Sequence, residues 1–252
     1  MKSPLKDDLN FRCTAFLKKK IPQGSIVHSF LFYGGEAELS LARSKRFVVA
    51  HTNRYALYEF WTCALHDPLR VSQAAEYFFP IENESLFEVL QKGWDSYRGH
   101  FTRAGIFFLL NHCSIGGFVS CGELKNENFS PMVLHRLRGF SIDNFYLFYD
   151  ECEDYLRGID AVKRADYLLF PVGKYSFNLF DEGKNRGSET TLVNHKKLKE
   201  KLQKLDRKWV VVYKYHPRVL KEYKDYNVTM ISKYGQPTKH ENMCEDIVIA
   251  NF

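Results

Sequence analysis

Hydrophobic residues along the chain fall into short continuous runs that are rich in β-branched and aromatic side chains. Runs of this kind, with few polar interruptions, are typical of strands buried on both faces of a sheet. The pattern predicts strands at Ser25 to Phe32, Arg46 to Ala50, Asn144 to Tyr149, Asp166 to Pro171 and Lys208 to Tyr213.

Helical periodicity separates these strands and is clearest between Val193 and Leu205. There, Leu198, Leu202 and Leu205 recur at i, i+4 and i+7, which places them on one face of a helix. The remaining surface of this helix carries Lys196, Lys197, Lys199, Lys201 and Lys204. The alternation of strands and helices predicts a mainly parallel α/β sheet, whose ligands bind at the carboxyl ends of the strands.

The alternation stops between Tyr77 and Leu137, where the sequence is largely helical, rich in aromatic residues and interrupted by the Gly116-Gly117 turn. No repeat, low-complexity segment or Pro/Gly-rich linker divides the chain. We therefore expect one core formed by residues 1–76 and 138–252, with residues 77–137 inserted into it.

The composition is that of a globular protein. Of 252 residues, 45% are hydrophobic and 26% are charged, which excludes the collagen-like, disordered and disulfide-scaffold classes. The chain has 36 Lys and Arg against 30 Asp and Glu, a formal charge of +6. This excess permits a polyanionic partner without requiring one.

Cysteine spacing and hydropathy limit the compartment and the cofactors. The six cysteines form no CxxC pair and show no Cys/His ligand spacing, so we expect neither a zinc site nor a disulfide framework. The start MKSPLKDDLNF carries charges where a signal peptide has an apolar stretch, and no window reaches the roughly 18 to 20 apolar residues of a membrane span. We expect an intracellular protein with no metal and no membrane contact.

Five segments together carry a resemblance to a known family. They read IPQGSIVHSFLFYGGEAELSLARSKRFVVAHTN, RAGIFFLLNHCSIGGF, DYLLFPVGKY, WVVVYKYHPRVLKEYKDYNV and EDIVIANF, in chain order. In this order they resemble the Dam-type adenine-N6 DNA methyltransferases, with their PFxGxG loop, RAxxFxxLNRxxxNGL segment and DPPY motif. The resemblance covers nearly the whole chain. It implies a Rossmann-like S-adenosylmethionine-dependent core with a mainly helical, inserted recognition domain.

The positions that this resemblance assigns to the cofactor are altered. Gly34 matches the glycine-containing loop, but its last glycine is replaced by Glu36. The family also places an acid at the end of the second strand, where it accepts hydrogen bonds from ribose hydroxyls. That position is His51 here, and none of the small residues of the family's N-terminal WAGGK-like segment remains at residues 6–10. The resemblance thus implies a degenerate cofactor site at Phe32, Gly34, Glu36, His51 and Asn53.

The catalytic motif has lost both of its functional groups. The family's DPPY falls on Phe170, Pro171, Val172 and Gly173. In the family, the first residue accepts a hydrogen bond from the adenine amine and the Tyr stacks on the flipped base. Phenylalanine has no acceptor and glycine has no aromatic face, so we expect no catalysis. Tyr175 remains an alternative stacking group, and Asp166 or Asp181 remain alternative acceptors.

Residues that could bind DNA survive only in part. The Arg of the family's recognition turn is Ser120, whereas Arg103 and Asn111 match. These two residues are candidates for nucleic-acid contact, although helix-surface charge and local capping explain them as well. The lysine face listed above is a further candidate, with a solvated helix face as its alternative.

We expect a catalytically inactive Dam-like protein that acts as a binding or structural subunit of a larger intracellular or virus-encoded assembly. The chain has 21 Phe and 15 Tyr, a surplus that suits a protein interface. A protein partner is expected and DNA is a candidate partner, with no cofactor. The alternatives are an active S-adenosylmethionine-dependent adenine-N6 DNA methyltransferase with divergent motifs and a non-catalytic DNA-binding protein.

Overall fold

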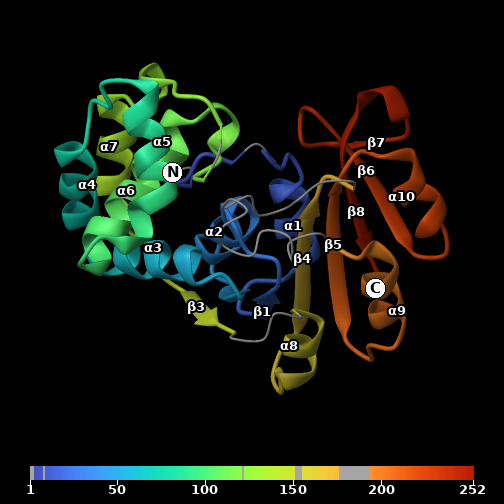
Figure 1. The fold of residues 1–252 in the computed structure, drawn as a ribbon. Helices are drawn as coiled ribbons and strands as arrows, with labels where there is room; N and C mark the ends of the chain where they lie inside the picture. The colour runs from blue at the N-terminus through green and yellow to red at the C-terminus, as the bar shows by residue number, and fades with distance from the viewer. Residues whose placement is uncertain (1–2, 8, 121, 151–154, 176–192) are drawn as a thin grey trace. The chain divides into compact units, whose positions relative to one another are not determined.

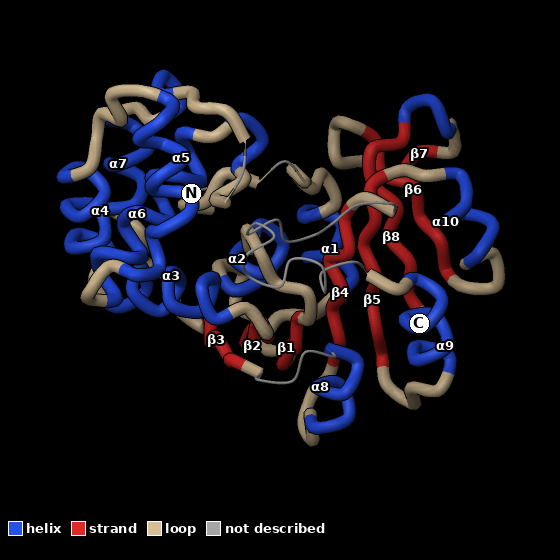
Figure 2. The backbone as a smooth tube through the Cα atoms, in the orientation of Figure 1, coloured by secondary structure: helices blue, strands red, loops and turns tan. Residues whose placement is uncertain are grey.

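The structure, a computed structural model, describes residues 3–7, 9–120, 122–150, 155–175 and 193–252. Packing divides these residues into two compact units (Figures 1 and 2). The helical unit comprises residues 3–7 and the described part of 54–142, and the sheet unit comprises 9–53 with the described residues from 143 to the C-terminus.

One sheet of eight strands forms the centre of the sheet unit, with the order β3-β2-β1-β4-β5-β8-β6-β7. Its first part is parallel and consists of β1 (Ile26–Ser29), β2 (Phe47–Thr52), β3 (Phe145–Tyr149), β4 (Tyr167–Gly173) and β5 (Lys208–Lys214). The remaining strands are β6 (Asn227–Ser232), β7 (Pro237–Thr238) and β8 (Cys244–Ala250). Strand β8 runs antiparallel to both of its neighbours, β5 and β6.

The five predicted strands and the mainly parallel α/β sheet are confirmed. They are visible in the sequence because strands buried on both faces, such as β4, leave no polar positions in the run. The antiparallel end of the sheet was not predicted, since β6 is partly exposed along most of its length. Starting from β3, the order of the parallel strands is that of doubly wound α/β folds.

Helices cover this sheet unevenly. Helix α1 (Thr14–Lys20) packs on α2 (Glu36–Ala42), which lies against β2 and β3. Along the chain, α8 (Tyr155–Ala161) follows β3, α9 (His195–Gln203) follows β4, and α10 (Pro217–Glu222) follows β5. The helix predicted between Val193 and Leu205 is α9, and its Leu198 and Leu202 are buried as the periodicity requires.

The helical unit is organised around α6 (His100–Cys113), whose last ten residues, from Ala104 to Cys113, are all buried. Around it pack α3 (Tyr55–His66), α4 (Pro68–Tyr77) and α5 (Glu84–Gly93), and α7 (Pro131–Arg138) packs on α4. Gly105 sets the spacing of α4 and α6, since a Cβ at this position would lie 2.5 Å from the Cβ of Ala74. The helical character predicted for residues 77–137 is therefore observed.

This unit is wider than the predicted insertion of residues 77–137. Helices α3 and α4 belong to it because both pack directly on α6. The apolar pattern of Tyr55–His66 shows that the helix has a buried face, but not whether a sheet or other helices bury it.

Candidate functional site

The strand order places a switch point at the carboxyl ends of β1 and β4. Connections from these neighbouring strands run in opposite directions along the sheet, and doubly wound sheets bind ligands at such a switch point. The predicted cofactor and catalytic positions lie here: Phe32, Gly34 and Glu36 follow β1, His51 and Asn53 end or follow β2, and Phe170 to Gly173 end β4. The structure thus gathers both predicted sets at one end of the sheet.

A row of aromatic rings crosses this end of the sheet, one from each of four neighbouring strands. Phe148, His51, Phe30 and Phe170 belong to or directly follow β3, β2, β1 and β4. The ring of Phe30 stacks on His51 with centroids 4.6 Å apart and on Phe170 at 5.5 Å. Phe148 contacts the outer side of His51 at 5.5 Å. The inner three rings are buried, so the row fills the sheet end with the chain's own side chains.

His51 is held by a second histidine. Its Nε2 lies 2.8 Å from Nδ1 of His28, and His28 also bonds to the backbone of Arg164. If His28 donates to that backbone, its Nδ1 accepts and His51 Nε2 donates, which leaves only Nδ1 of His51 as an acceptor. Burial, and then the neighbouring His28, lower the pKa of His51 to about 4, so this ring is neutral at pH 7. Its position suits packing better than the bonding of ribose hydroxyls.

The loop after β1 is packed against its own side chains. A Cβ at Gly35, where φ is +75°, would lie 2.7 Å from the ring of Phe32 and 3.5 Å from Leu39. Gly34 and Phe32 are buried, and Glu36 begins α2 at the surface side of the loop, partly exposed. The backbone at Gly35 therefore approaches the ring of Phe32 so closely that only glycine fits at this position.

A buried acid that the sequence did not single out lies beside this loop. Glu38, in the first turn of α2, is 2% exposed and accepts a hydrogen bond from Ser29 Oγ at 2.7 Å. Ser29 is the last residue of β1, so this bond ties the strand end to the helix. A carboxylate in the first turn is also favoured by the helix dipole. No local sequence pattern predicts the bond between Ser29 and Glu38, because an acidic residue in the first turn of a helix is common.

The four residues that the resemblance aligns with the catalytic motif form part of the core. Phe170 and Val172 are fully buried in β4, and a register shift lies between Pro171 and Gly173. At Gly173, where φ is +77°, a Cβ would lie 2.4 Å from the side chain of Leu9. The side chain of Leu9 therefore occupies the space directly beside Gly173.

Of the two alternative acceptors, Asp166 lies at the opposite end of the sheet from Phe170. Asp166 precedes β4 and bonds to Ile26 at the start of β1, through its own amide at 2.9 Å and its carboxylate at 2.8 Å. It therefore lies at the amino end of the sheet, roughly 13 Å along the strand from Phe170. Asp181 lies outside the described residues.

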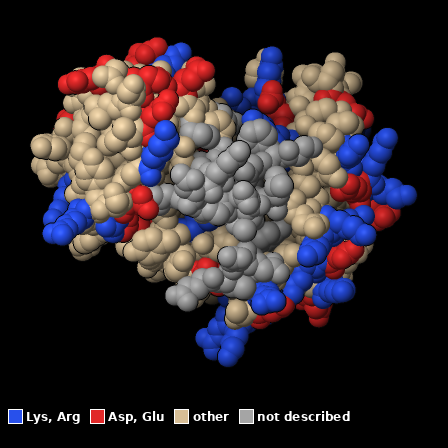
Figure 3. Space-filling model, viewed as in Figure 1, with Lys and Arg blue, Asp and Glu red and all other residues tan. Residues whose placement is uncertain are grey.

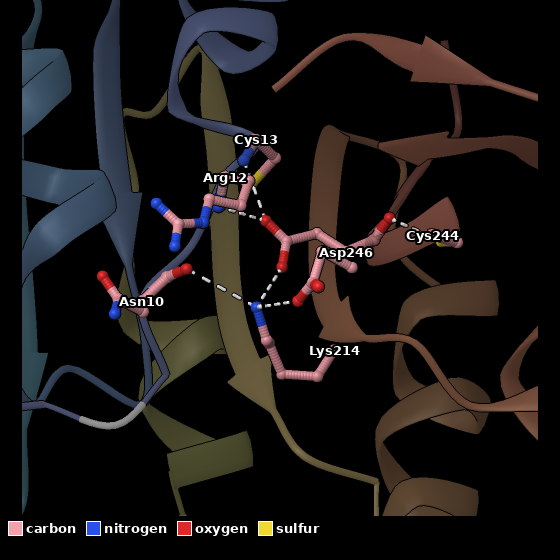
Figure 4. Close-up of polar contacts among 7 residues, drawn as sticks. Asn10, Arg12, Cys13, Lys214, Cys244 and Asp246 are labelled. Carbon is pink, nitrogen blue, oxygen red and sulfur yellow. Dashed lines mark hydrogen bonds and ion pairs between the residues drawn. The ribbon is translucent and has the colours of Figure 1, made fainter. Parts of the chain in front are cut away.

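A buried carboxylate anchors the segment that includes Leu9 (Figure 4). Asp246 of β8 is fully buried and accepts hydrogen bonds from the backbone amides of Arg12 and Cys13, the latter at 2.8 Å. Lys214, at the end of β5, donates to the other carboxylate oxygen at 2.6 Å and approaches the Asn10 carbonyl at 3.5 Å. Because the carboxylate is both hydrogen-bonded and ion-paired, its burial is compensated. These contacts fix residues 10–13 within the sheet unit.

Tyr175 does not present a free face for stacking. His195 covers one side of the ring at 4.3 Å and His216 stacks on it at 4.7 Å, both nearly parallel to it. The Tyr175 hydroxyl donates to Glu222, which raises its pKa. His216 also caps α10 by accepting from the amide of Arg218 at 3.2 Å. The ring of Tyr175 therefore packs with two imidazoles of the same chain.

Arg103 and Asn111 belong to the helical unit and have partners within it. Arg103 forms a two-point ion pair with Glu59, whose Oε2 lies 2.8 Å from Nε, and donates to the Tyr97 carbonyl at 2.9 Å. Its hydrogen bond with Glu59 raises the pKa of Arg103. The partner Glu59 is 44 positions away in the chain, so no local pattern could have found it. Arg103 joins α3 to α6 and is only 23% exposed.

Asn111 docks the N-terminal segment onto α6. Its Oδ1 accepts from the Lys6 amide at 2.7 Å, and its Nδ2 donates to the carbonyls of Lys6 at 3.1 Å and Gly117 at 2.8 Å. His112 adds a hydrogen bond of 2.8 Å to the Pro4 carbonyl. A Cβ at Gly117 would lie 3.0 Å from the Lys6 carbonyl oxygen. The Asn and Gly positions of this segment are therefore explained by packing.

The lysines of α9 divide into two groups. Lys196, Lys197 and Lys204 are exposed, whereas Lys199 donates to the Glu222 carbonyl and Lys201 pairs with Asp160. Figure 3 shows basic and acidic side chains interspersed over the side of the molecule where Figure 1 places α9 and α10. Three lysines, not five, are therefore available to a polyanion.

The cysteines of the described residues are thiols. Cys13, Cys63, Cys113 and Cys244 are unpaired, and burial raises the pKa of Cys113 to about 12 and of Cys63 to about 11. Over the same residues, no group of three or more His, Cys, Asp or Glu is placed to hold a metal ion. Nor is any described helix both long and apolar enough to cross a membrane.

The chain was compared with protein-family models and with curated proteins. No protein-family model matches the chain, and no curated protein matches its sequence. The functional assignment therefore rests on the site itself, an end of a doubly wound sheet that is packed with aromatic side chains.

Proposed function

We propose that the chain is a catalytically inactive protein with a Dam-like methyltransferase fold, which acts as a binding or structural subunit. The observation that carries this proposal is the buried row of His51, Phe30 and Phe170 at the switch point of the sheet. The order β3-β2-β1-β4-β5, with a separate helical unit joined to it, is compatible with the fold that the resemblance implies.

The side chains at this end of the sheet do not fit S-adenosylmethionine. That cofactor needs an acceptor for its ribose hydroxyls and open space beside a glycine loop. His51 keeps a single acceptor, Nδ1, where the family has a carboxylate, because its Nε2 contacts His28. Glu36 replaces the last glycine of the loop. We therefore derive no methyl-transfer step for this chain.

The position that the resemblance assigns to the adenine acceptor carries no group that could activate an adenine amine. Phe170 carries no polar atom, and its ring is fully buried. Loss of an oriented hydrogen-bonding group at a reacting centre commonly costs 100-fold or more in rate, on the order of 3 kcal/mol. The ring of Tyr175 already stacks with His195 and His216, so a flipped base would have to displace an imidazole to stack there.

A methyl-transfer assay tests the loss of catalysis. The full chain is incubated with tritiated S-adenosylmethionine and a mixed-sequence duplex rich in adenine, and the radioactivity on the DNA is counted. We expect counts at the level of the reaction without protein. Methyl groups on adenine N6 above that level would overturn the proposal.

DNA association is tested separately, because binding does not need catalysis. The exposed Lys196, Lys197 and Lys204 predict at most weak duplex binding that falls steeply with salt, as for other phosphate contacts. In an electrophoretic shift at 50 mM salt, Lys196→Glu combined with Lys197→Glu should abolish such binding. Lys92→Glu, a 70% exposed lysine of the helical unit, serves as the matched control. An equal shift for both variants would exclude α9 as the DNA-binding surface.

A further inference from the structure

Four apolar side chains of the parallel sheet are exposed, and together they form what we call the sheet patch. Ile26 and Phe47, at the starts of β1 and β2, are 36% and 45% exposed. Tyr146 and Phe148 of β3 are 59% and 55% exposed. Parallel sheets usually have both faces covered, so a patch of this kind marks a surface that another molecule binds.

Strand register places the sheet patch on one face. Ile26 pairs with Phe47, and His51 pairs with Phe148. Because side chains alternate between faces, Phe47 and His51 of β2 share a face, and so do Tyr146 and Phe148 of β3. Positions two apart on a strand are separated by about 7 Å, so the rings of Tyr146 and Phe148 follow one another along β3.

Helix α8 covers the part of this face next to the sheet patch. A Cβ at Gly158 of α8 would lie 3.5 Å from the ring of Phe30, and Phe30 stacks on His51, which lies on the patch face. Because a helix is about 10 Å across, the patch lies below the outer surface of α8. A flexible chain can reach such a recessed surface more easily than a flat bilayer can.

Basic residues of the turns before β2 and β4 border the sheet patch. Lys45 is exposed and lies in the turn before β2. Lys163 and Arg164 are exposed and lie between α8 and β4. The backbone of Arg164 bonds to the ring of His28, which shares a face with the patch because it lies two positions after the first residue of β1.

Arg207, which precedes β5, adds a further cation to this border. It donates a hydrogen bond to the carbonyl of Val162, the residue before Lys163. Burial and, more weakly, the charge of Arg207 lower the pKa of His28, so this guanidinium lies near the patch face.

The four cations of the border are Lys45, Lys163, Arg164 and Arg207. Within the described residues, none of them forms an ion pair with a carboxylate. Two exposed acids, Asp143 and Asp166, lie at the same end of the sheet, and Asp166 accepts a hydrogen bond from the amide of Ile26 at 2.8 Å. Positive charge is therefore in excess along this border.

Exposed rings beside unpaired cations match the chemistry of a single nucleic-acid strand. Proteins bind such strands by stacking aromatic side chains on the bases and by placing cations at the phosphates. The bases of a duplex are paired and stacked on each other, so they cannot stack on Tyr146 or Phe148. A second copy of the chain would bring its own basic border against this one, and like charges would oppose that contact.

The side chains of the sheet patch favour DNA over RNA. A ribose carries a 2′-hydroxyl, which needs a hydrogen-bond partner when it is buried. The Tyr146 hydroxyl is the one polar side-chain group of the patch, and the other three side chains are hydrocarbons. Deoxyribose has no such hydroxyl and is therefore buried here at a lower cost.

We propose that the sheet patch binds single-stranded DNA, with bases stacked on Phe47, Tyr146 and Phe148 and phosphates held by the basic border. A bound strand would cover the face that is otherwise exposed. This site goes beyond the proposed function and does not depend on it, because stacking on the patch requires neither S-adenosylmethionine nor the lysines of α9.

Fluorescence anisotropy of a labelled 12-nucleotide DNA strand of mixed sequence tests the proposal. The full chain is titrated into this strand at 25 mM salt, and into an abasic strand of equal length that keeps the phosphates. We expect saturable binding of the first strand and at least tenfold weaker binding of the abasic strand, because stacking contributes on the order of 1–3 kcal/mol per base. No binding of the DNA strand at 100 µM protein would overturn the proposal, as would equal binding of the two strands.

Matched variants locate the stacking surface. Tyr146→Ala should weaken binding roughly 5- to 150-fold without changing its salt dependence, because the phosphate contacts remain. Tyr234→Ala, at a 72% exposed aromatic residue near the opposite edge of the sheet, is the control and should bind like the wild type. Circular dichroism melts confirm that both variants are folded. Equal affinities of Tyr146→Ala and the wild type would refute stacking on the patch.

Salt dependence locates the phosphate contacts. Lys163→Gln combined with Arg164→Gln should reduce the slope of log affinity against log salt by about 1.4, or about 0.7 for each cation removed. Lys196→Gln combined with Lys197→Gln, on α9, is the control and should leave the slope unchanged. An equal slope for the border variant and the wild type would exclude these two cations as phosphate ligands and overturn the assigned border.

Competing ligands are titrated in the same assay: RNA of the same sequence, the corresponding DNA duplex, and vesicles of anionic phospholipid. Tighter binding of any of the three than of single-stranded DNA would overturn the proposal. Methyl transfer is measured separately, so failure of the sheet patch to bind DNA and failure of the proposed function give different results.

Discussion

Replacement of Phe170 by alanine tests most sharply whether the end of the sheet is packed core. The ring is fully buried and stacks on Phe30 at 5.5 Å, and Phe30 is in turn stacked on His51. Strand β4 is buried at every position, so its neighbours cannot easily collapse into the space that the substitution leaves. Phenylalanine-to-alanine changes at such sites cost about 3–5 kcal/mol, and we expect a value near the middle of that range.

Urea denaturation followed by circular dichroism gives the change in overall stability. Because the chain has two units, native-state hydrogen exchange of the peptide covering Tyr167–Gly173 should be measured as well, since it reports opening of the sheet unit itself. Phe170→Leu, which keeps most of the volume, should cost about 1 kcal/mol. Tyr234→Ala, at a 72% exposed position, should stay within about 0.5 kcal/mol of the wild type.

A small effect would refute the reasoning. If Phe170→Ala loses less than about 1 kcal/mol, the ring lines an open space and is not part of a packed core. In that case the end of the sheet could receive a ligand, and the proposed loss of cofactor binding would lose its structural basis.

Three further predictions concern the helical unit. Gly105→Ala should lower the free energy of unfolding by about 1–3 kcal/mol, because its Cβ would lie 2.5 Å from the Cβ of Ala74. Gly93→Ala is the control, because the nearest atom to its Cβ would be 3.9 Å away, and it should not destabilise the protein by a clash. Thermal melts compare the two variants. Asn111→Ala should cost about 2–3 kcal/mol and speed proteolysis of the N-terminal segment, because the buried side chain makes three backbone hydrogen bonds; unchanged digestion would contradict this role. Burial lowers the pKa of His112 to about 4, so the unfolded chain binds a proton at a higher pH than the folded chain does. We therefore expect the free energy of unfolding to fall by up to roughly 3 kcal/mol as the pH drops from about 6.5 to 4. Urea midpoints of His112→Gln should depend less on pH than those of the wild type, and an equal pH dependence would exclude His112 as the cause.

The parallel part of the sheet could be predicted because its strands are local features of the sequence. A strand buried on both faces, such as Tyr167–Gly173, needs no long-range information to be recognised. The antiparallel end could not be predicted in this way. Its strand β6 is half-exposed, and β8 is inserted between β5 and β6 by pairings that span many residues.

The candidate site was located by its residues but not by their contacts. The positions of His51 and Phe170 at strand ends follow from the chain order, yet their shared stacking on Phe30 depends on the strand order β2-β1-β4. The bond between His51 and His28 depends in the same way on the register of β1 and β2. Stacking and bonding of this kind are properties of the assembled sheet, which the sequence pattern does not contain.

Calorimetric titration of the full chain with S-adenosylmethionine tests the central claim most directly. The cofactor is the ligand that a methyltransferase site at the carboxyl ends of β1 and β4 would require. With Phe32, His51 and Leu9 in the positions described above, we predict no binding heat up to 1 mM ligand, which corresponds to a binding free energy weaker than about −4 kcal/mol. Saturable one-to-one binding in the micromolar range would contradict the account.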